Sequence, residues 1–398
     1  MRGEEVPAPG VGRSRKKAGY GLSAGRRQIR RLGLSFIPGL VWLGFLVLGY
    51  QLLSRHSDWA EVYSRYIRAW LIRPLVWLNS LLPFSLTELL LLPAALILLC
   101  LLLRLLFSWL APAGRRVIRA LRSLRALYIL LIIAMSLYLL FHGYNFLRQP
   151  LSESLDLPVQ AQSSQTLYDV CVLLEQHAAA LREQLPEDQD GVFALDTSET
   201  QAQLFKRANL GYEAAAQTIS ILSGPTVLAK GVWLSHWWSY TGTTGMFMPL
   251  LAEANVNTDV QPDEELFTIL HEMAHVHGIA REDEANFVAF LTGIDHPDPD
   301  FQYAAYLSAL IHGSNSLYKY DKDLWQQLWE QIPDSLQRDI QARNVYWDQF
   351  EGPVQTQTQK TNDSFLKANR QESGIHSYGQ MIDLVISYYQ KQGVIDLG

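Results

Sequence analysis

The chain has 398 residues, of which 48% are hydrophobic and 18% are charged. This length and composition exclude a disordered or collagen-like protein and allow two or three domains. The net charge of −6 is unevenly distributed, because residues 1–148 carry 20 Lys/Arg and 5 Asp/Glu whereas residues 149–398 carry 13 and 34. The two cysteines, Cys100 and Cys171, lie far apart in the chain, which excludes a disulfide scaffold and a Cys-rich zinc site.

The first part of the chain is typical of a membrane anchor. Three apolar runs of about 20 residues predict transmembrane helices over 34–53, 86–107 and 126–146. A cleaved signal peptide explains the first run less well, because a long basic region precedes it and no clear cleavage site follows. The segment 58–82 mixes arginines with Trp and Leu, which predicts an amphipathic helix at the membrane interface. We therefore expect a basic cytoplasmic tail over 1–33, a membrane anchor over 34–148, and the lipid bilayer as a partner.

The basic residues indicate the orientation of this anchor. Nine Lys/Arg precede the first apolar run, and five arginines lie between the second and the third. The positive-inside rule assigns both groups to the cytoplasm, so three spans leave residues 149–398 outside it. Four arginines in the 54–85 link weaken this argument. We expect a multi-pass protein of the cell membrane with an extracytoplasmic domain, and no nucleic-acid partner, since topology explains the basic stretches.

The second part of the chain predicts a helix-dominated α+β fold. Apolar spacing favours helices over Ser164–Gln184 and Glu199–Leu222. Residues 227–260 are rich in Gly, Thr, Trp and alternating apolar residues, which predicts a small β-sheet. Helical patterns return after Asp263. The predicted fold class is thus transmembrane helices followed by a mostly helical domain, 149–398, with a small sheet.

An HExxH motif lies inside one of these helices. His271 and His275 are four residues apart, so they project from the same face of a helix and suit one zinc ion. Glu272 is adjacent to the first histidine and suits a general base that takes the proton of a zinc-bound water. Gly278 is placed to end the helix. The sequence therefore predicts a zinc site with Glu272 as a catalytic residue.

A catalytic zinc ion usually has three protein ligands. A second helix opens shortly after the motif with Glu282, Asp283 and Glu284, and Asn286 follows one turn after Glu282. We favour Glu282 as the third metal ligand, with Glu284 as the alternative, and expect Asn286 to orient a ligand. Acidic residues also favour a helix N-terminus without binding any metal.

These motifs resemble those of a known class of enzymes. An HExxH helix followed by a helix opening Glu-x-Glu-Ala-Asn is similar to the gluzincin-type metallopeptidases, in which a Glu on the second helix completes the zinc site. The stretch from Ser239 to Phe287 resembles an uncharacterised family of bacterial membrane proteins with N-terminal spans and a zincin-like domain. The resemblance implies a zinc-dependent peptidase with His271, His275 and Glu282 as ligands. Asn286 departs from the Asp that many gluzincins have, and the gap from the motif to Glu282 is shorter.

Two further elements bear on peptide hydrolysis. Gly245–Leu251 is a candidate edge strand to which an extended peptide substrate would add, or else a buried core strand. Glu253, Asn255 and Asn257 would share one face of an extended segment and line a cleft, or form a turn. Tyr378 is a candidate catalytic donor to the oxyanion, in a Ser-Tyr that the resemblance includes, or a packed tyrosine.

We therefore expect a membrane-anchored zinc metallopeptidase acting on a peptide or protein substrate. One alternative is a catalytically inactive zincin-like protein that binds metal or peptide as a sensor or assembly factor. Another is a structural membrane protein whose HExxH is incidental.

Overall fold

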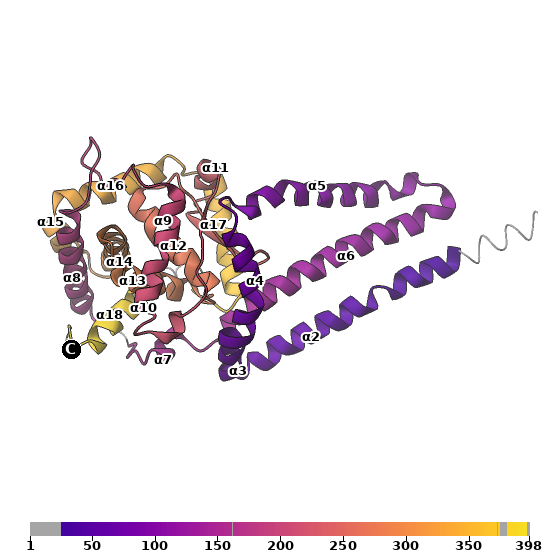
Figure 1. The fold of residues 1–398 in the computed structure, drawn as a ribbon, viewed down its shortest axis with the longest axis horizontal. Coiled ribbons are helices and arrows are strands. Elements are labelled where there is room, and N and C mark those ends of the chain that lie inside the picture. The colour runs from indigo at the N-terminus through magenta and orange to yellow at the C-terminus, as the bar shows by residue number, and fades with distance from the viewer. Residues whose placement is uncertain (1–24, 161, 372, 375–379, 396–398) are drawn as a thin grey trace, which may run out of the picture. The chain divides into compact units, whose positions relative to one another are not determined.

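The computed structural model describes residues 25–395, apart from 161, 372 and 375–379. The chain forms two compact units. The first comprises the described residues within Met1–Tyr50 and Leu90–Ser136, and the second comprises Gln51–Leu89 and those within Leu137–Gly398. Both units are predominantly helical (Figure 1).

Three helices are long and apolar enough to cross a membrane, at Gly25–Leu53, Leu86–Leu110 and Ala113–Phe141. They contain the α-helices α2 (Ile37–Leu53), α5 (Leu86–Leu106) and α6 (Arg116–Phe141), and 3-10 turns at Phe107–Leu110 and Ala113–Arg115. Within the first unit, Trp42 of α2 donates a hydrogen bond to Ser136 Oγ of α6 at 2.9 Å. Most other large apolar side chains of α2 and α5 are exposed, as expected for helices that face lipid.

The third helix ends earlier than its apolar run. The predicted span 126–146 corresponds to α6, which stops at Phe141, and Gly143–Leu147 form a buried 3-10 turn, η4, in the second unit. The Phe141 carbonyl instead accepts hydrogen bonds from Arg68 Nε (2.8 Å) and Asn145 Nδ2 (3.1 Å). These side chains satisfy a backbone group that the helix leaves unpaired at its end.

The second unit contains most of the helices. Before α5 lie α3 (Ser57–Val62), the π-helical turn η1 (Tyr63–Arg68) and α4 (Ala69–Ser80). After η4 the helices are α7 (Leu151–Ser154), α8 (Ser164–Arg182), α9 (Gln201–Arg207), α10 (Asn209–Ala215), the 3-10 turn η5 (Ser220–Leu222), α11 (Ser235–Ser239), α12 (Pro262–Val276), α13 (Glu282–Ile294), α14 (Pro299–Tyr320), α15 (Lys322–Gln331), α16 (Asp334–Asp348), α17 (Pro353–Ala368) and α18 (Met381–Lys391).

Helix α8 confirms the prediction over Ser164–Gln184. The single helix predicted over Glu199–Leu222 is wrong, because this segment is divided into α9, α10 and η5. The Asn209 side chain donates to the Val227 carbonyl and accepts from the Val227 N–H, both at 2.8 Å. The Asn209 side chain thus binds the start of α10 to a later segment. This side-chain-to-backbone contact competes with a continuous helix, and the spacing of apolar residues does not reveal it.

A three-stranded mixed sheet lies beside α12. Its strands are β1 (Lys230–Gly231), β2 (Gly245–Met248) and β3 (Glu253–Val256), in the order β1-β3-β2, with β1 parallel and β2 antiparallel to β3. Strand β2 is therefore an edge strand among the described residues, the first of the two alternatives for Gly245–Leu251, and it ends at Met248. Asn257 N–H bonds to the Thr244 carbonyl at 2.7 Å. Because ladder bonds alternate, the N–H and C=O groups of Gly245 and Phe247 face the open edge.

Glu253 and Asn255 differ from both expectations, since they are buried in β3, whereas the Asn257 side chain accepts from the Asp259 N–H at 3.0 Å, as in a turn. The Glu253 carboxylate accepts hydrogen bonds from the N–H groups of Leu86 (2.9 Å) and Thr87 (2.8 Å), the first residues of α5. Asn255 Oδ1 accepts from Ser85 Oγ at 2.6 Å. These contacts cap the N-terminus of α5, where a carboxylate is stabilising.

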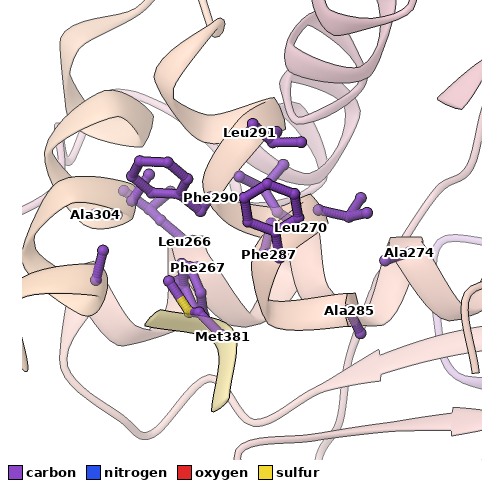
Figure 2. Packing of buried hydrophobic residues seen from close by; sticks show 14 of the residues in the cluster. Leu266, Phe267, Leu270, Ala274, Ala285, Phe287, Phe290, Leu291, Ala304 and Met381 are labelled. Carbon is purple, nitrogen blue, oxygen red and sulfur yellow. The ribbon is translucent and has the colours of Figure 1, made fainter. Parts of the chain in front are cut away.

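The second unit has one hydrophobic core, formed by buried apolar residues from many of its helices. Figure 2 shows part of it, with apolar side chains from α12, α13, α14 and α18 packed together: Leu266, Phe267, Leu270, Ala274, Ala285, Phe287, Phe290, Leu291, Ala304 and Met381. Ile72 and Val76 of α4 are 1% and 2% exposed and belong to the same core. We call residues 57–80 the juxtamembrane segment; its inner face is therefore part of the domain that contains HExxH.

Candidate metal centre

Helix α12 carries the HExxH motif and is held at both ends. It begins with Pro262 followed by three acidic residues, which suit the positive end of the helix dipole. Gly278 follows the helix with a φ of +95°, a left-handed conformation that favours glycine. In the middle, the Tyr212 hydroxyl donates to the Leu270 carbonyl at 2.7 Å. Contacts outside the candidate metal ligands therefore support the position of the helix.

The structure brings the three predicted ligands together. His271 Nε2 and His275 Nε2 are 3.2 Å apart, and Glu282 Oε2 of α13 lies 3.1 Å from the first and 3.4 Å from the second. The three donor atoms lie within 4.8 Å of one another, and all three residues are buried. This group can hold one metal ion.

The other ring nitrogens show that a metal fits. His271 Nδ1 lies 2.6 Å from Asn286 Oδ1, and His275 Nδ1 lies 2.7 Å from the Ile279 carbonyl. Since both partners are acceptors, each Nδ1 carries a proton, and in the neutral ring each Nε2 would offer its lone pair to a metal ion at the shared point. Two imidazole nitrogens and one carboxylate oxygen at 3.1–3.4 Å from one another form a donor set that one metal ion would suit. Asn286 thus contacts His271, as its expected orienting role requires, and the role itself stays a prediction.

The Glu284 carboxylate is not part of the His-His-Glu cluster. Its Oε1 accepts hydrogen bonds from the Leu151 N–H and from Arg281 Nη1, each at 2.7 Å. Glu282 instead faces the two histidines. Burial opposes its ionisation, but the contacts that Glu282 makes with His275 and His271 outweigh burial and hold its pKa well below its usual range. The carboxylate in the cluster is therefore charged.

Glu272 lies beside the cluster without a complete set of partners. It is 4% exposed, and its Oε2 has no hydrogen-bond partner among the described residues. Burial raises the pKa of Glu272 to about 7, although His271 and His275 lower it. The start of β2 lies directly against this side chain: a Cβ on Gly245 would be 2.4 Å from Glu272 Oε1. Only glycine allows the open-edged strand to approach the carboxylate so closely.

The comparisons with known proteins give one family. A protein-family profile described as "Protein of unknown function (DUF3810)" matches residues 63–386. The chain belongs to the DUF3810 family. No curated protein and no solved structure matches the chain. The DUF3810 match begins at Tyr63, the first residue of η1, so it includes the juxtamembrane arginine Arg68 as well as the metal centre.

Within the DUF3810 region, sequence reasoning missed His142. This residue follows α6, is 6% exposed, and its ring lies 5.7 Å from the ring of His275 and 5.4 Å from that of Phe247 in β2. Its Nδ1 has no hydrogen-bond partner among the described residues. Burial lowers the pKa of His142 to about 3, so the ring is neutral. A histidine at the end of an apolar run was the available signal.

Tyr378, the predicted catalytic donor, lies outside the residues that the structure describes.

Proposed function

We propose that this DUF3810 protein is a membrane-anchored zinc metallopeptidase that hydrolyses peptide bonds in peptide or protein substrates. The observation that carries the proposal is the placement of Glu272, buried and incompletely paired beside a His-His-Glu cluster and under an open-edged strand. A protein that only stores or senses a metal needs the three ligands but not this carboxylate.

Two imidazole nitrogens and one carboxylate oxygen form a donor set that catalytic zinc uses. A zinc ion held by His271, His275 and Glu282 would acidify a water molecule and polarise the substrate carbonyl. Glu272 would take the proton of the attacking water and deliver it to the leaving amine. Asn286 would keep the His271 ring oriented.

The open edge of β2 supports a peptide as the substrate. The N–H and C=O groups of Gly245 and Phe247 would pair with an extended peptide, which fixes its backbone beside Glu272 without selecting a particular sequence. Glu272, the proposed catalytic residue, and β2, the strand proposed to bind the substrate, thus meet at Gly245.

The distribution of basic residues supports an extracytoplasmic active site in a multi-pass protein of the cell membrane.

The test uses the purified full chain in detergent. Zinc per chain is measured by mass spectrometry after metal removal and reloading, for wild type, His271→Ala and Glu272→Gln. We expect about one zinc in wild type and in Glu272→Gln, and none in His271→Ala. Cleavage of a peptide library should be about 10²- to 10⁴-fold slower for Glu272→Gln than for wild type.

The outcomes separate the alternatives. Equal zinc binding with no cleavage by wild type would favour the catalytically inactive zincin-like sensor or assembly factor. Absence of zinc from reloaded wild type would leave a structural membrane protein with an incidental HExxH. Equal cleavage by wild type and Glu272→Gln would remove Glu272 from the mechanism.

A further inference from the structure

A cavity lies at the C-terminal end of α12, and the side chains of the three predicted metal ligands do not line it. Its volume is about 280 Å³, and it is lined by η1 and α4, by the loop after η5 and by the last residues of the motif helix. Three arginines line it: Arg65, Arg68 and Arg148. Arg65 and Arg148 both pair with Glu61, while Arg68 pairs with no described carboxylate. The three guanidinium groups therefore have one paired carboxylate among them, and Arg68 does not contact it.

Of these three arginines, Arg68 has the highest free-energy cost of burial, because it is only 1% exposed. Its Nε donates to the Phe141 carbonyl, and its Nη2 donates to the carbonyls of Val276 (2.9 Å) and His275 (3.1 Å). These carbonyls at a helix end offset part of the cost of burying a cation. They carry no net charge, however, and Nη1 has no acceptor among the described residues. A buried cation without a counter-ion is unfavourable.

Two more polar groups in the cavity wall lack partners. Ser64 is 3% exposed, and its Oγ has no hydrogen-bond partner among the described residues. Both ring nitrogens of His277 also lack a hydrogen-bond partner among the described residues, and the ring stacks on Tyr212. A hydroxyl and an imidazole beside guanidinium groups are donors that bind a phosphate oxygen. The cavity thus offers charge and hydrogen bonds that the protein itself leaves unused.

We propose that this cavity binds a phosphate group, and that the phosphate belongs to a phospholipid headgroup. The volume is close to the lower limit for small-ligand pockets, which suits a headgroup. The outer face of the same segment exposes Tyr66 (68%) and Trp70 (71%), and the segment lies between two candidate membrane helices. Exposed aromatic side chains are typical of the membrane interface.

Occupancy of the cavity has a consequence for the metal centre. Arg68 Nη2 holds the carbonyl of His275, a predicted metal ligand, so a bound phosphate would stabilise the turn that carries this ligand. The proposal does not depend on peptidase activity, because it concerns a different set of side chains and is tested without any substrate.

The experiment measures the melting temperature of the full chain in an uncharged, phosphate-free detergent. One arm adds dihexanoyl phosphatidylglycerol and the other adds inorganic phosphate at equal concentrations. The test variant is Ser223→Glu, which places a carboxylate in the cavity at an exposed lining residue. The matched control is Ser364→Glu, at an exposed serine on α17 that does not line the cavity.

We expect the lipid to raise the melting temperature of wild type and of Ser364→Glu by roughly 5–10 °C at a hundredfold excess over its dissociation constant. Ser223→Glu should lose this shift. Arg65→Gln, at a side chain 39% exposed, should reduce the shift without unfolding the protein. An equal shift with inorganic phosphate alone, lost in Ser223→Glu, would support the site but overturn the lipid as its source. No shift in either arm, or equal shifts in both Glu variants, would overturn the proposal.

Discussion

The α12–α13 helix pair and the juxtamembrane segment both bury charged side chains, but their partners lie at very different distances along the chain. In the helix pair, His271 contacts Asn286 only 15 residues away. In the juxtamembrane segment, Arg68 binds the carbonyl of His275 across 207 residues, and Arg148 binds that of Gly278 across 130. A local motif thus indicates the candidate metal centre, whereas the support of the same helix comes from residues that no motif marks.

Deleting the juxtamembrane segment should have the largest effect. A fragment of residues 149–398 lacks Ile72 and Val76, each contributing about 1.5–3 kcal/mol by burial, and lacks the Arg68 cap. We expect it to lack a cooperative thermal transition by circular dichroism. A chain that begins at residue 51 keeps the whole second unit and serves as the control. Cooperative melting of the short fragment at the temperature of this control would show that the segment is dispensable.

The next prediction concerns the two acidic residues of α13. Glu282→Gln should weaken zinc binding by more than about 100-fold, since it removes the charge of a direct ligand, a larger loss than for an outer partner. Glu284→Gln should retain wild-type zinc affinity, because Glu284 binds Leu151 and Arg281 instead. Competition with a chelator of known affinity measures both. The reverse order of affinities would assign the third ligand to Glu284.

Arg68→Met tests the remote support of α12. It leaves the carbonyls of His275 and Val276 without donors, which should lower the free energy of unfolding by about 2–3 kcal/mol. Arg73→Met is the matched control: Arg73 is an exposed arginine of α4, so the change should be within about 0.5 kcal/mol. Denaturant titration gives both values. Equal effects of the two substitutions would mean that the cap contributes nothing specific.

Asn286→Ala is the smallest of these changes. Loss of its contact with His271 Nδ1 should reduce zinc affinity by about 10- to 100-fold while the fold is retained. Asn286→Asp keeps an acceptor at this position and should bind zinc as wild type does. The same chelator competition measures both variants, and an unchanged affinity in Asn286→Ala would remove this residue from the metal centre.

The sequence predicts the parts of the fold and site that depend on neighbouring residues. The spacing of apolar residues predicts α8, and the HExxH motif predicts that the two histidines lie together. The acidic opening of the next helix predicts Glu282 as their neighbour. The break between α9 and α10 escaped prediction because it depends on the contact of Asn209 with Val227. The end of α6 at Phe141 likewise depends on Arg68, a residue 73 positions away.

The burial of Arg68 left one signal in the sequence. Arg68, Ile72 and Val76 are spaced four residues apart, so they share one face of their helix, and all three are at most 2% exposed. An arginine in line with an apolar stripe indicates a cation with a partner in the interior. The identity of that partner was not predictable, because it requires knowing which distant helix end meets the stripe.

The division of the second unit into two separate stretches constrains how the protein is made. The candidate membrane helices Leu86–Leu110 and Ala113–Phe141 separate most of the two stretches along the chain, so the stretches lie on one side of any membrane that both helices cross. The ribosome completes the juxtamembrane segment long before the motif helix that it supports. At about 5–20 residues per second, the 207 residues between Arg68 and His275 take about 10–40 s to synthesise. During that interval Arg68 lacks the α12 carbonyls that it binds in the folded chain, and Ile72 and Val76 lack most of the core into which they pack.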